Sequence, residues 1–466
     1  MSHHSWNADE LRTKFTHALS DMYRAEVPLY GTLLDIVRHV DRSVLDGQGK
    51  DLEELPIRHN IERHGAIRLG TANELRLIKR LFKIFGMYPV GYYDLHVVGF
   101  PLHGTAFRPI DQLSLMNNPF RVFATVLRTE LVSTEIRSMA EKTLEMRNLF
   151  SPRLLEIIQN AEAGKGMTSQ DADDLILESL KIFKWHSQST VAFDEYMTLK
   201  EAHPMIADIV CFPSVHINHL TPRTLDIDLV QEEMIKHNMP TKERIEGPPR
   251  RKCSILLRQT SFKALEERVR FYSSGQAYVD GTHTARFGEV EQRGAAVTRK
   301  GRNLYDQLLS VAMKEAANIS LQFPDFEKIL STSFSNFPDD WSELRKQGLV
   351  YFHYKVTSKG RQYSQRWLGQ RDARVKMEEL ISLGLVEVNP ITYEDFLPFS
   401  AAGIFKSNIG NGPAAPEFLV NESNLNGLEK ALGCKVRDEF ELYQQLQDSS
   451  VKECACALGL DDIIMQ

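Results

Sequence analysis

The sequence of 466 residues predicts an α+β fold. Several long segments carry apolar residues at three- and four-residue spacing, which is typical of amphipathic helices that pack on a core. Other segments are rich in β-branched and aromatic residues. They follow the order strand, helix, then several strands, and this order occurs twice. Two βαβββ units paired into a cup would explain the repeat, with the long helical segments added around it.

The chain begins with a segment, residues 1–60, that we expect to be mainly helical. Residues 8–40 show the helical spacing. The apolar side chains that carry it are Leu11, Phe15, Leu19, Met22 and Tyr23.

Residues 61–116 are expected to form the first βαβββ half. The stretch "RHGAIRLG" has an extended pattern and is followed by the helical stretch "TANELRLIKRLFKIFG". Thr71 is a plausible N-cap of this helix, Glu74 stands three residues further on, and Gly86 marks its end. The β-rich stretches "YPVGYYDLHVV" and "HGTAFRPI" follow.

The rest of the chain divides into four expected segments. These are a helical insertion at 117–200, the second βαβββ half at 201–320, a mixed α/β segment at 321–415 and a C-terminal extension at 416–466. In the second half, strands are expected at 208–228, near 253–261, 269–273 and 282–298, and helices at 229–238 and 303–318.

Composition excludes several classes of protein. A net charge of −6 and a pI near 6.2 leave no broad basic field for nucleic acid. There is no apolar run of about 18 residues to span a membrane, and the N-terminus has no apolar core of a secretory signal. The five cysteines are too few and too scattered for a disulfide framework. We therefore expect a cytoplasmic protein.

The stretch "IERHGAIRLGT" places an imidazole and a guanidinium in an apolar setting. If it is extended, His64, Ala66 and Arg68 share one face, and Ile67 and Leu69 share the other. Burying that polar face is costly unless something anionic or metallic meets it. A core histidine beside a satisfied arginine is the alternative.

The second half adds a further candidate ligand, His219, in "VHINHL". Read as a strand, His219 ends the more apolar face and His216 lies among polar neighbours. Two histidines at this spacing in a strand cannot both face one ion, so His219 is the candidate ligand and His216 is structural. A satisfied core histidine is again the alternative.

Glu289 and Glu291 share a strand face with Phe287. Two carboxylates beside apolar side chains need a cation or water, although a solvated strand would also explain them. His64, His219 and Glu291 would make a set of two histidines and one carboxylate. Such a set leaves metal positions open for a chelating substrate and O2, as in non-haem Fe(II) oxygenases.

Five motifs, taken together and in this order, carry a family resemblance. They are "RHGAIRLGT", "YYDLHVVGFPLHGTAFRP", "VHINHLTPRTLDID", "ARFGEVEQRGAAVTRKGR" and "FLPFSAAGIFKSN". The chain from residue 10 to about 415 resembles the 2-oxoadipate dioxygenase/decarboxylase family of the vicinal oxygen chelate superfamily. This resemblance implies a metal cup of βαβββ modules and an Fe(II) enzyme that converts 2-oxoadipate and O2 to 2-hydroxyglutarate and CO2. His64, His219 and Glu291 match the family's iron ligands, and Arg68 matches its substrate-binding arginine.

The resemblance also bears on two local details. The superfamily's last ligand often ends a G-x-x-E motif, and Gly288 to Glu291 fits that spacing, which favours Glu291 over Glu289. The family's substrate loop has a valine before the serine of "SAAGIF", where this chain has Phe399 before Ser400. A larger ring there would reshape the pocket and would affect the choice of substrate more than the type of reaction.

Other functions remain open at this point. The same fold can support a reaction on a different 2-oxo acid, an extradiol-type dioxygenase or a zinc-type isomerase. A non-catalytic scaffold protein is also conceivable, although it would need neither the two histidines nor Arg68. The sequence does not give the oligomeric state.

Overall fold

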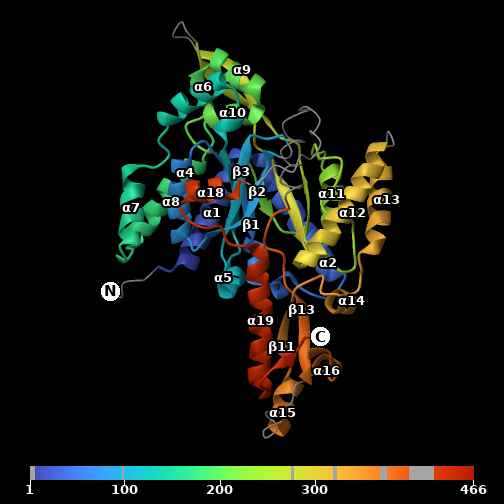
Figure 1. Cartoon of the computed structure of the whole chain (residues 1–466). Helices are drawn as coiled ribbons and strands as arrows, with labels where there is room; N and C mark the ends of the chain where they lie inside the picture. Colours follow the sequence, from blue (N-terminus) through green and yellow to red (C-terminus); the bar gives the residue numbers. More distant parts are fainter. Residues whose placement is uncertain are drawn as a thin grey trace. The chain divides into compact units, whose positions relative to one another are not determined.

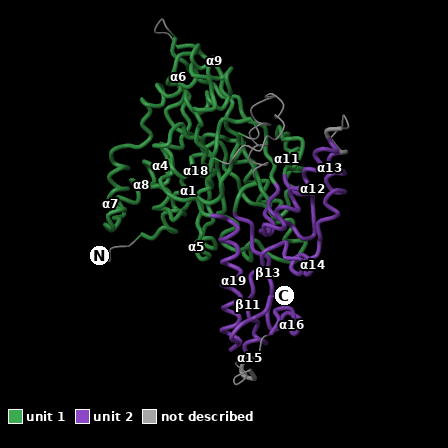
Figure 2. Tube along the Cα trace, in the orientation of Figure 1, with its two compact units in different colours: residues 1–246, 259–292, 395–437 green, residues 247–258, 293–394, 438–466 purple. Residues whose placement is uncertain are grey.

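The structure is a computed structural model (Figure 1). It describes residues 6–96, 99–273, 278–318, 323–367, 375–397 and 424–465. The chain forms two compact units, each made of separate stretches of sequence (Figure 2). Unit 1 holds residues 1–246, 259–292 and 395–437, and unit 2 holds residues 247–258, 293–394 and 438–466. The six consecutive segments expected from the sequence stay a prediction.

The N-terminal helical segment is two long helices. The expectation of one helix over 8–40 is wrong in this respect, because α1 (Ala8–Glu26) ends before α2 (Pro28–Asp46) begins. Pro28 has no backbone N–H to donate, so it is tolerated in the first turn of a helix but not in its interior. The chain therefore breaks at Val27, which is the residue between the two helices.

The βαβββ order expected after residue 60 is confirmed, although its last strand lies beyond the expected bounds of 61–116, which stay a prediction. Its elements are β1 (Arg63–Leu69), α4 (Ala72–Ile84), β2 (Tyr88–Asp94), β3 (Leu102–Arg108) and β4 (Arg121–Leu127). With β6 (Leu220–Pro222) they form a five-stranded sheet in the order β2-β3-β4-β1-β6, in which β1 and β4 are parallel. The strand β4 lies in the range expected to be helical.

The predicted start of α4 is also confirmed. The Thr71 side chain accepts a hydrogen bond from the backbone of Glu74, and the Glu74 side chain accepts one from the backbone of Thr71. Gly86 follows the helix with a φ of +67°, a conformation that glycine adopts without strain.

The two faces of this sheet differ. Residues of one face join the core formed with the N-terminal helices, namely Ile67, Leu69, Val122, Ala124 and Val126. The other face combines the small side chains of Ala66 and Ala106 with the functional side chains of His64 and Arg68. Phe123 of β4 lies between Ala66 and Ala106 and pairs with both of them.

The second βαβββ order is present, but its strands form separate sheets. After β6 come α11 (Ile227–Lys236), β7 (Leu257–Ser261), β8 (Glu266–Tyr272), β9 (Tyr278–Thr284) and β10 (Glu289–Arg293). β10 pairs with β7, whereas β8 lies between β9 and β5 (Gln188–Ala192).

The expected strand over 208–228 is wrong for most of its length. Its first residues belong to α10 (Pro204–Val210), and the chain from 211 to 219 is irregular up to β6. Residues Met205 to Val210 are all buried. A short apolar run of this kind does not distinguish a buried helix from a strand.

The other helices of unit 1 surround these strands (Figure 1). They are α3 (Ile57–Ile61), α5 (Gln112–Asn117), α6 (Thr134–Glu145), α7 (Pro152–Glu162), α8 (Ser169–Phe183), α9 (Phe193–Ala202) and α18 (Leu425–Leu432).

Unit 2 contains both helices and strands. Its helices are α12 (Arg299–Asn318), α13 (Phe323–Ser333), α14 (Trp341–Lys346), α15 (Ser358–Trp367), α16 (Met377–Ser382) and α19 (Glu439–Leu458). Its strands are β11 (Phe352–Val356), antiparallel to β13 (Val386–Pro390), and β12 (Val375–Lys376), parallel to β14 (Ile463–Ile464).

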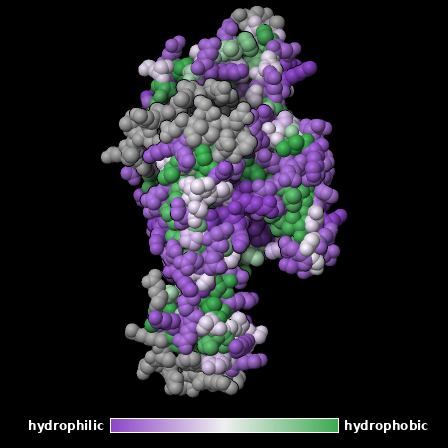
Figure 3. Space-filling view, turned by 90° about the vertical axis from the view of Figure 1, so that its right-hand side faces the viewer, coloured by the Kyte–Doolittle hydropathy of each residue, from purple (hydrophilic) through white to green (hydrophobic). Residues whose placement is uncertain are grey.

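Hydrophilic side chains cover much of the face shown in Figure 3, and apolar ones gather in separate patches. Within the described part of the chain, no helix is both long and apolar enough to cross a membrane.

Candidate metal centre

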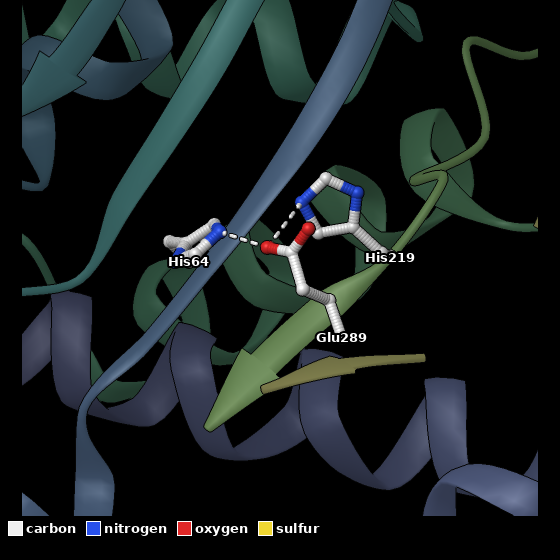
Figure 4. A group of neighbouring side chains, drawn as sticks. All are labelled: His64, His219 and Glu289. Carbon is white, nitrogen blue, oxygen red and sulfur yellow. Dashed lines mark hydrogen bonds and ion pairs between the residues drawn. The ribbon is translucent and has the colours of Figure 1, made fainter. Parts of the chain in front are cut away.

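Three buried side chains from distant parts of unit 1 meet at one point (Figure 4). Oε1 of Glu289 lies 2.8 Å from Nε2 of His64 and 3.8 Å from Nε2 of His219. The three residues form a group whose ligand atoms all lie within 4.8 Å of one another. Two imidazoles and a carboxylate at this separation are suitable ligands for one divalent transition metal ion.

The backbone around residue 218 brings the two histidines together. The Asn218 N–H donates to the carbonyl of Ala66, and the Asn218 carbonyl accepts from the N–H of Phe287, each at 3.0 Å. His219 is therefore held between β1, which carries His64, and the start of β10, which carries Glu289.

Gly65 makes this close approach possible. A Cβ at this position would lie 2.8 Å from the carbonyl oxygen of His219 and would overlap the side chain of Ile217. Any larger residue beside His64 would force the segment that carries His219 away from β1.

The hydrogen bonds of the group leave some of its ligand atoms unused. Oε1 of Glu289 also accepts from Gln259 and from the Thr221 hydroxyl, each at 2.9 Å. Among the described residues, no hydrogen-bond partner reaches Oε2 of Glu289 or either ring nitrogen of His219. Buried polar atoms without a partner are costly, so these residues fit a bound metal ion.

Both histidines are neutral at physiological pH, as coordination requires. Burial, assisted by Arg121, lowers the pKa of His64 to about 4, although Glu289 acts in the opposite direction. Burial and the neighbouring His64 hold the pKa of His219 well below its usual range.

Glu291 lies behind His64, outside this group. Its Oε1 is 3.2 Å from Nδ1 of His64, and its Oε2 accepts from Arg121 at 2.8 Å. Burial raises the pKa of Glu291 to about 7, although Arg121 lowers it. The expected ligand carboxylate therefore lies at the opposite edge of the imidazole from Glu289.

Arg68 shares the sheet face of His64, and it is paired with a carboxylate of the protein. Its Nη1 donates to Oδ2 of Asp208 at 2.5 Å, and both side chains are buried. In the orientation of the Asn218 amide in which both its nitrogen and its oxygen have hydrogen-bond partners, the oxygen accepts from the same Nη1 at 2.7 Å.

The expected substrate-loop residues Phe399 and Ser400 lie outside the described residues. Phe396, just before them, packs edge-on against His64 with 5.0 Å between ring centroids. The Arg121 guanidinium lies over the Phe396 ring at 4.5 Å.

Sequence reasoning missed Arg121, Asp208 and Phe396. The available signals for the first two were a charged residue at the start of the apolar run "RVFATVL" and another inside "MIADIVCF".

Comparisons with known proteins identify the family of this chain. The family model of 2-oxoadipate dioxygenase/decarboxylase matches residues 15–408. The 2-oxoadipate dioxygenase/decarboxylase of Escherichia coli (strain K12) is 48% identical over 456 residues, which are 97% of this chain and 99% of that protein. The protein of the same name from Pseudomonas putida is 46% identical over 463 residues, 97% of each chain.

A solved structure extends the match to three dimensions. The hydroxyglutarate synthase of Pseudomonas putida in complex with 2-oxoadipate superposes with a TM-score of 0.86 at 43% identity, over 98% of this chain and 99% of that chain. The similarity thus runs through both units and includes every segment that supplies the buried group. The chain belongs to the 2-oxoadipate dioxygenase/decarboxylase family.

Proposed function

We propose that this protein is an oxidoreductase that converts 2-oxoadipate and O2 to 2-hydroxyglutarate and CO2 with Fe(II) as its cofactor. The observation that carries the proposal is the buried group of His64, His219 and Glu289 in a chain of this family. The atoms balance, because the C1 carboxylate leaves as CO2 with its own oxygens and both atoms of O2 end in 2-hydroxyglutarate, one in its new carboxylate and one in its hydroxyl group.

The proposed metal ligands are His64, His219 and Glu289, with Glu289 in place of Glu291. Glu289 is supported by its contacts with both imidazoles, whereas Glu291 lies against Nδ1 of His64, on the other side of that ring. Metal-bound histidines commonly donate their second N–H to a carboxylate, which fixes the tautomer and the ring orientation. We assign this orienting role to Glu291, held in turn by Arg121.

Bound Fe(II) would supply the redox chemistry and the positions at which the 2-oxo acid and O2 bind. Two histidines and one carboxylate are typical of non-haem Fe(II) oxygenases, which is why iron is proposed. The residues of the chain orient the substrate and exclude water. His64 and Glu289 are buried, and the Phe396 ring covers one side of His64. A dry site protects a reactive intermediate from side reactions.

Arg68 is the proposed partner of the distal substrate carboxylate. It lies four residues after His64 on the same strand face, so the two Cα atoms are about 13 Å apart at the usual strand rise. A substrate that chelates the metal at one end would place its far carboxylate in this direction. An arginine binds a carboxylate through two parallel hydrogen bonds and keeps its charge at any physiological pH. Phe399 and Ser400 as substrate contacts, and a cytoplasmic location, stay predictions from the sequence.

The test is a screen of 2-oxo acids with anaerobically loaded Fe(II) protein, in which O2 consumption and CO2 release are measured together. We expect 2-oxoadipate to be the best substrate, with one CO2 released per O2 and 2-hydroxyglutarate as the product. Turnover without O2 uptake would support an isomerase. Ring cleavage of a catechol would support an extradiol enzyme, and no turnover of any substrate would support a scaffold protein.

A further inference from the structure

Asp208 is the meeting point of three donors in unit 1. Its Oδ2 accepts from Arg68 at 2.5 Å, and its Oδ1 accepts from Nε2 of His283 at 2.8 Å and from Nε2 of His216 at 3.1 Å. All four side chains are buried. Burial alone would raise the pKa of Asp208, but Arg68 and the two imidazoles hold it well below its usual range. Asp208 is therefore a carboxylate with a fixed negative charge.

Its neighbours hold the two imidazoles rigidly. An ionised carboxylate can only accept, so each histidine donates from Nε2, and Nδ1 of His283 lies 3.0 Å from the Tyr196 hydroxyl. Trp185 stacks on His283 with 10° between the rings and meets His216 edge-on. Asp208 thus has little freedom to move away from Arg68.

The same types of residue could bind a second metal ion, since Asp208, His216 and His283 have their ligand atoms within 4.8 Å of one another. Two observations favour a hydrogen-bonded network instead. The permanent cation of Arg68 already pairs with this carboxylate, which disfavours a divalent ion beside it. The contacts of both imidazoles with Oδ1 are also at ordinary hydrogen-bond distances.

The network holds one edge of the Arg68 guanidinium. Nη1 donates both to Asp208 and to the Asn218 amide oxygen, which accounts for two of the five N–H groups of the side chain. Asn218 directly precedes the proposed ligand His219, and Arg68 shares β1 with His64. Two connections therefore fix the distance from the metal centre to the guanidinium. One is the strand that Arg68 shares with His64, and the other is the backbone that joins Asn218 to His219.

From this geometry we propose that Asp208 is a positioning residue, which with Asn218 holds Arg68 at a set distance from the metal centre. It thereby selects 2-oxo acids with a second carboxylate at one chain length. This inference rests on the proposed function. Without Asp208 the guanidinium can turn or approach the metal, so it binds the distal carboxylate in the wrong place or meets shorter diacids equally well.

The experiment compares Asp208→Asn with the wild type in the Fe(II)-loaded protein. Asparagine keeps the shape, removes the charge and can place an NH2 group against the Arg68 donor. We use 2-oxoadipate, the shorter 2-oxoglutarate, and 2-oxohexanoate, which has the same length as 2-oxoadipate but no second carboxylate. We expect kcat/KM for 2-oxoadipate to fall roughly 10- to 100-fold, as expected when a reacting group is misplaced by about 1 Å. The preference for 2-oxoadipate over both other acids should shrink, and the iron content should stay unchanged.

A double variant separates positioning from general damage. If Asp208 acts through Arg68, Asp208→Asn should add little further loss for 2-oxoadipate in an Arg68→Ala background, because residues that act as a unit are not additive. Calorimetry of 2-oxoadipate with the anaerobic Fe(II) protein gives a second readout that needs no turnover. We expect weaker binding in Asp208→Asn.

Asp41→Asn is the matched control, because Asp41 is also a buried carboxylate paired with a histidine, His59, at 2.8 Å. Any effect of Asp41→Asn should be equal for the three substrates.

Equal losses on all three acids in Asp208→Asn, additive losses in the double variant, or tighter 2-oxoadipate binding would overturn the proposal. Loss of a second equivalent of bound metal would show a metal site instead. A wild type that turns over no 2-oxo acid would contradict the proposed function itself, which the wild-type screen reveals before any variant is made.

Discussion

The carboxylate of Glu291 lies 3.2 Å from Nδ1 of His64, at the edge of the imidazole that faces away from His219 and Glu289. Two glutamates on one strand face thus contact opposite edges of the same ring. Their functions can be separated, because a ligand and a residue that orients a ligand respond differently to substitution.

The first prediction separates the two glutamates. Glu289→Ala should abolish iron binding, because it removes one of the three proposed ligands. Glu291→Gln should keep iron but weaken its affinity roughly 10- to 100-fold, which is the usual effect of losing a partner that orients a ligand. Metal analysis after anaerobic loading and desalting measures both.

His64→Ala and His219→Ala are the reference variants for complete loss of iron. Circular dichroism should show that all four proteins keep their fold. If Glu291→Gln loses iron while Glu289→Ala retains it, the G-x-x-E spacing identified the ligand correctly and our assignment of Glu289 is wrong.

The second prediction concerns pH and His103, a buried residue of β3. Burial, with help from Arg128, lowers the pKa of His103 to about 4, against about 6.5 in an unfolded chain. As the pH falls below 6.5, the unfolded chain binds a proton that the folded protein takes up only near pH 4. The folded state therefore loses stability across this window, by about 2 kcal/mol at about pH 5.

Replacement of the imidazole should remove this loss. We compare metal-free His103→Gln with the metal-free wild type. When the pH is lowered from about 7.5 to about 5, the drop in the free energy of unfolding should be about 2 kcal/mol smaller in the variant than in the wild type. Urea denaturation at the two pH values measures it. Parallel pH profiles for the two proteins would mean that the folded protein can protonate His103 without penalty.

Much of the fold could be predicted because local patterns carry it. The capping box at Thr71 and Glu74 and the β-rich composition of β2 and β3 depend only on neighbours in sequence. The helix α10 could not be distinguished from a strand, because a fully buried run has no polar face to reveal its period.

The candidate site was predictable as a set of residue types but not as a geometry. Alternation places Glu289 and Glu291 on the same face, so it cannot choose between them. The choice depends on where His64 and His219 lie in space. Arg121 and Asp208 were missed because their partners Glu291 and Arg68 are 170 and 140 residues away in the sequence.

The third prediction tests Arg68 as the partner of the distal carboxylate. Arg68→Ala should lower kcat/KM for 2-oxoadipate by at least about 100-fold, roughly 3 kcal/mol, mainly through KM, because a desolvated carboxylate loses its counter-charge. Iron content should stay normal. Arg68→Lys should recover only part of the loss, since an ammonium group cannot make two parallel hydrogen bonds to one carboxylate.

Arg80→Ala is the control for the loss of an arginine, because Arg80 pairs with Glu162 at the surface of unit 1. It should leave the kinetics unchanged. Normal turnover of 2-oxoadipate by Arg68→Ala, or a wild-type preference for an apolar 2-oxo acid, would remove Arg68 from this role and direct attention to Phe399.

The last prediction concerns Gly65, which lets the segment that carries His219 approach β1. A Cβ there would lie 2.8 Å from the His219 carbonyl oxygen, closer than such atoms pack, and would overlap the side chain of Ile217. Both neighbours belong to the same segment, so Gly65→Ala should push His219 away from His64. We expect kcat/KM to fall by about 100-fold, as for a shift of about 1 Å in a reacting group, with weaker iron binding and a stability loss of about 1–3 kcal/mol from overpacking.

Gly166→Ala is the matched control, because no atom lies within 4 Å of the added Cβ, and it should behave as the wild type. Steady-state kinetics, metal titration and urea denaturation on both variants measure these effects. If Gly65→Ala lowers stability but keeps full iron affinity and activity, the junction at residue 218 does not set the metal centre.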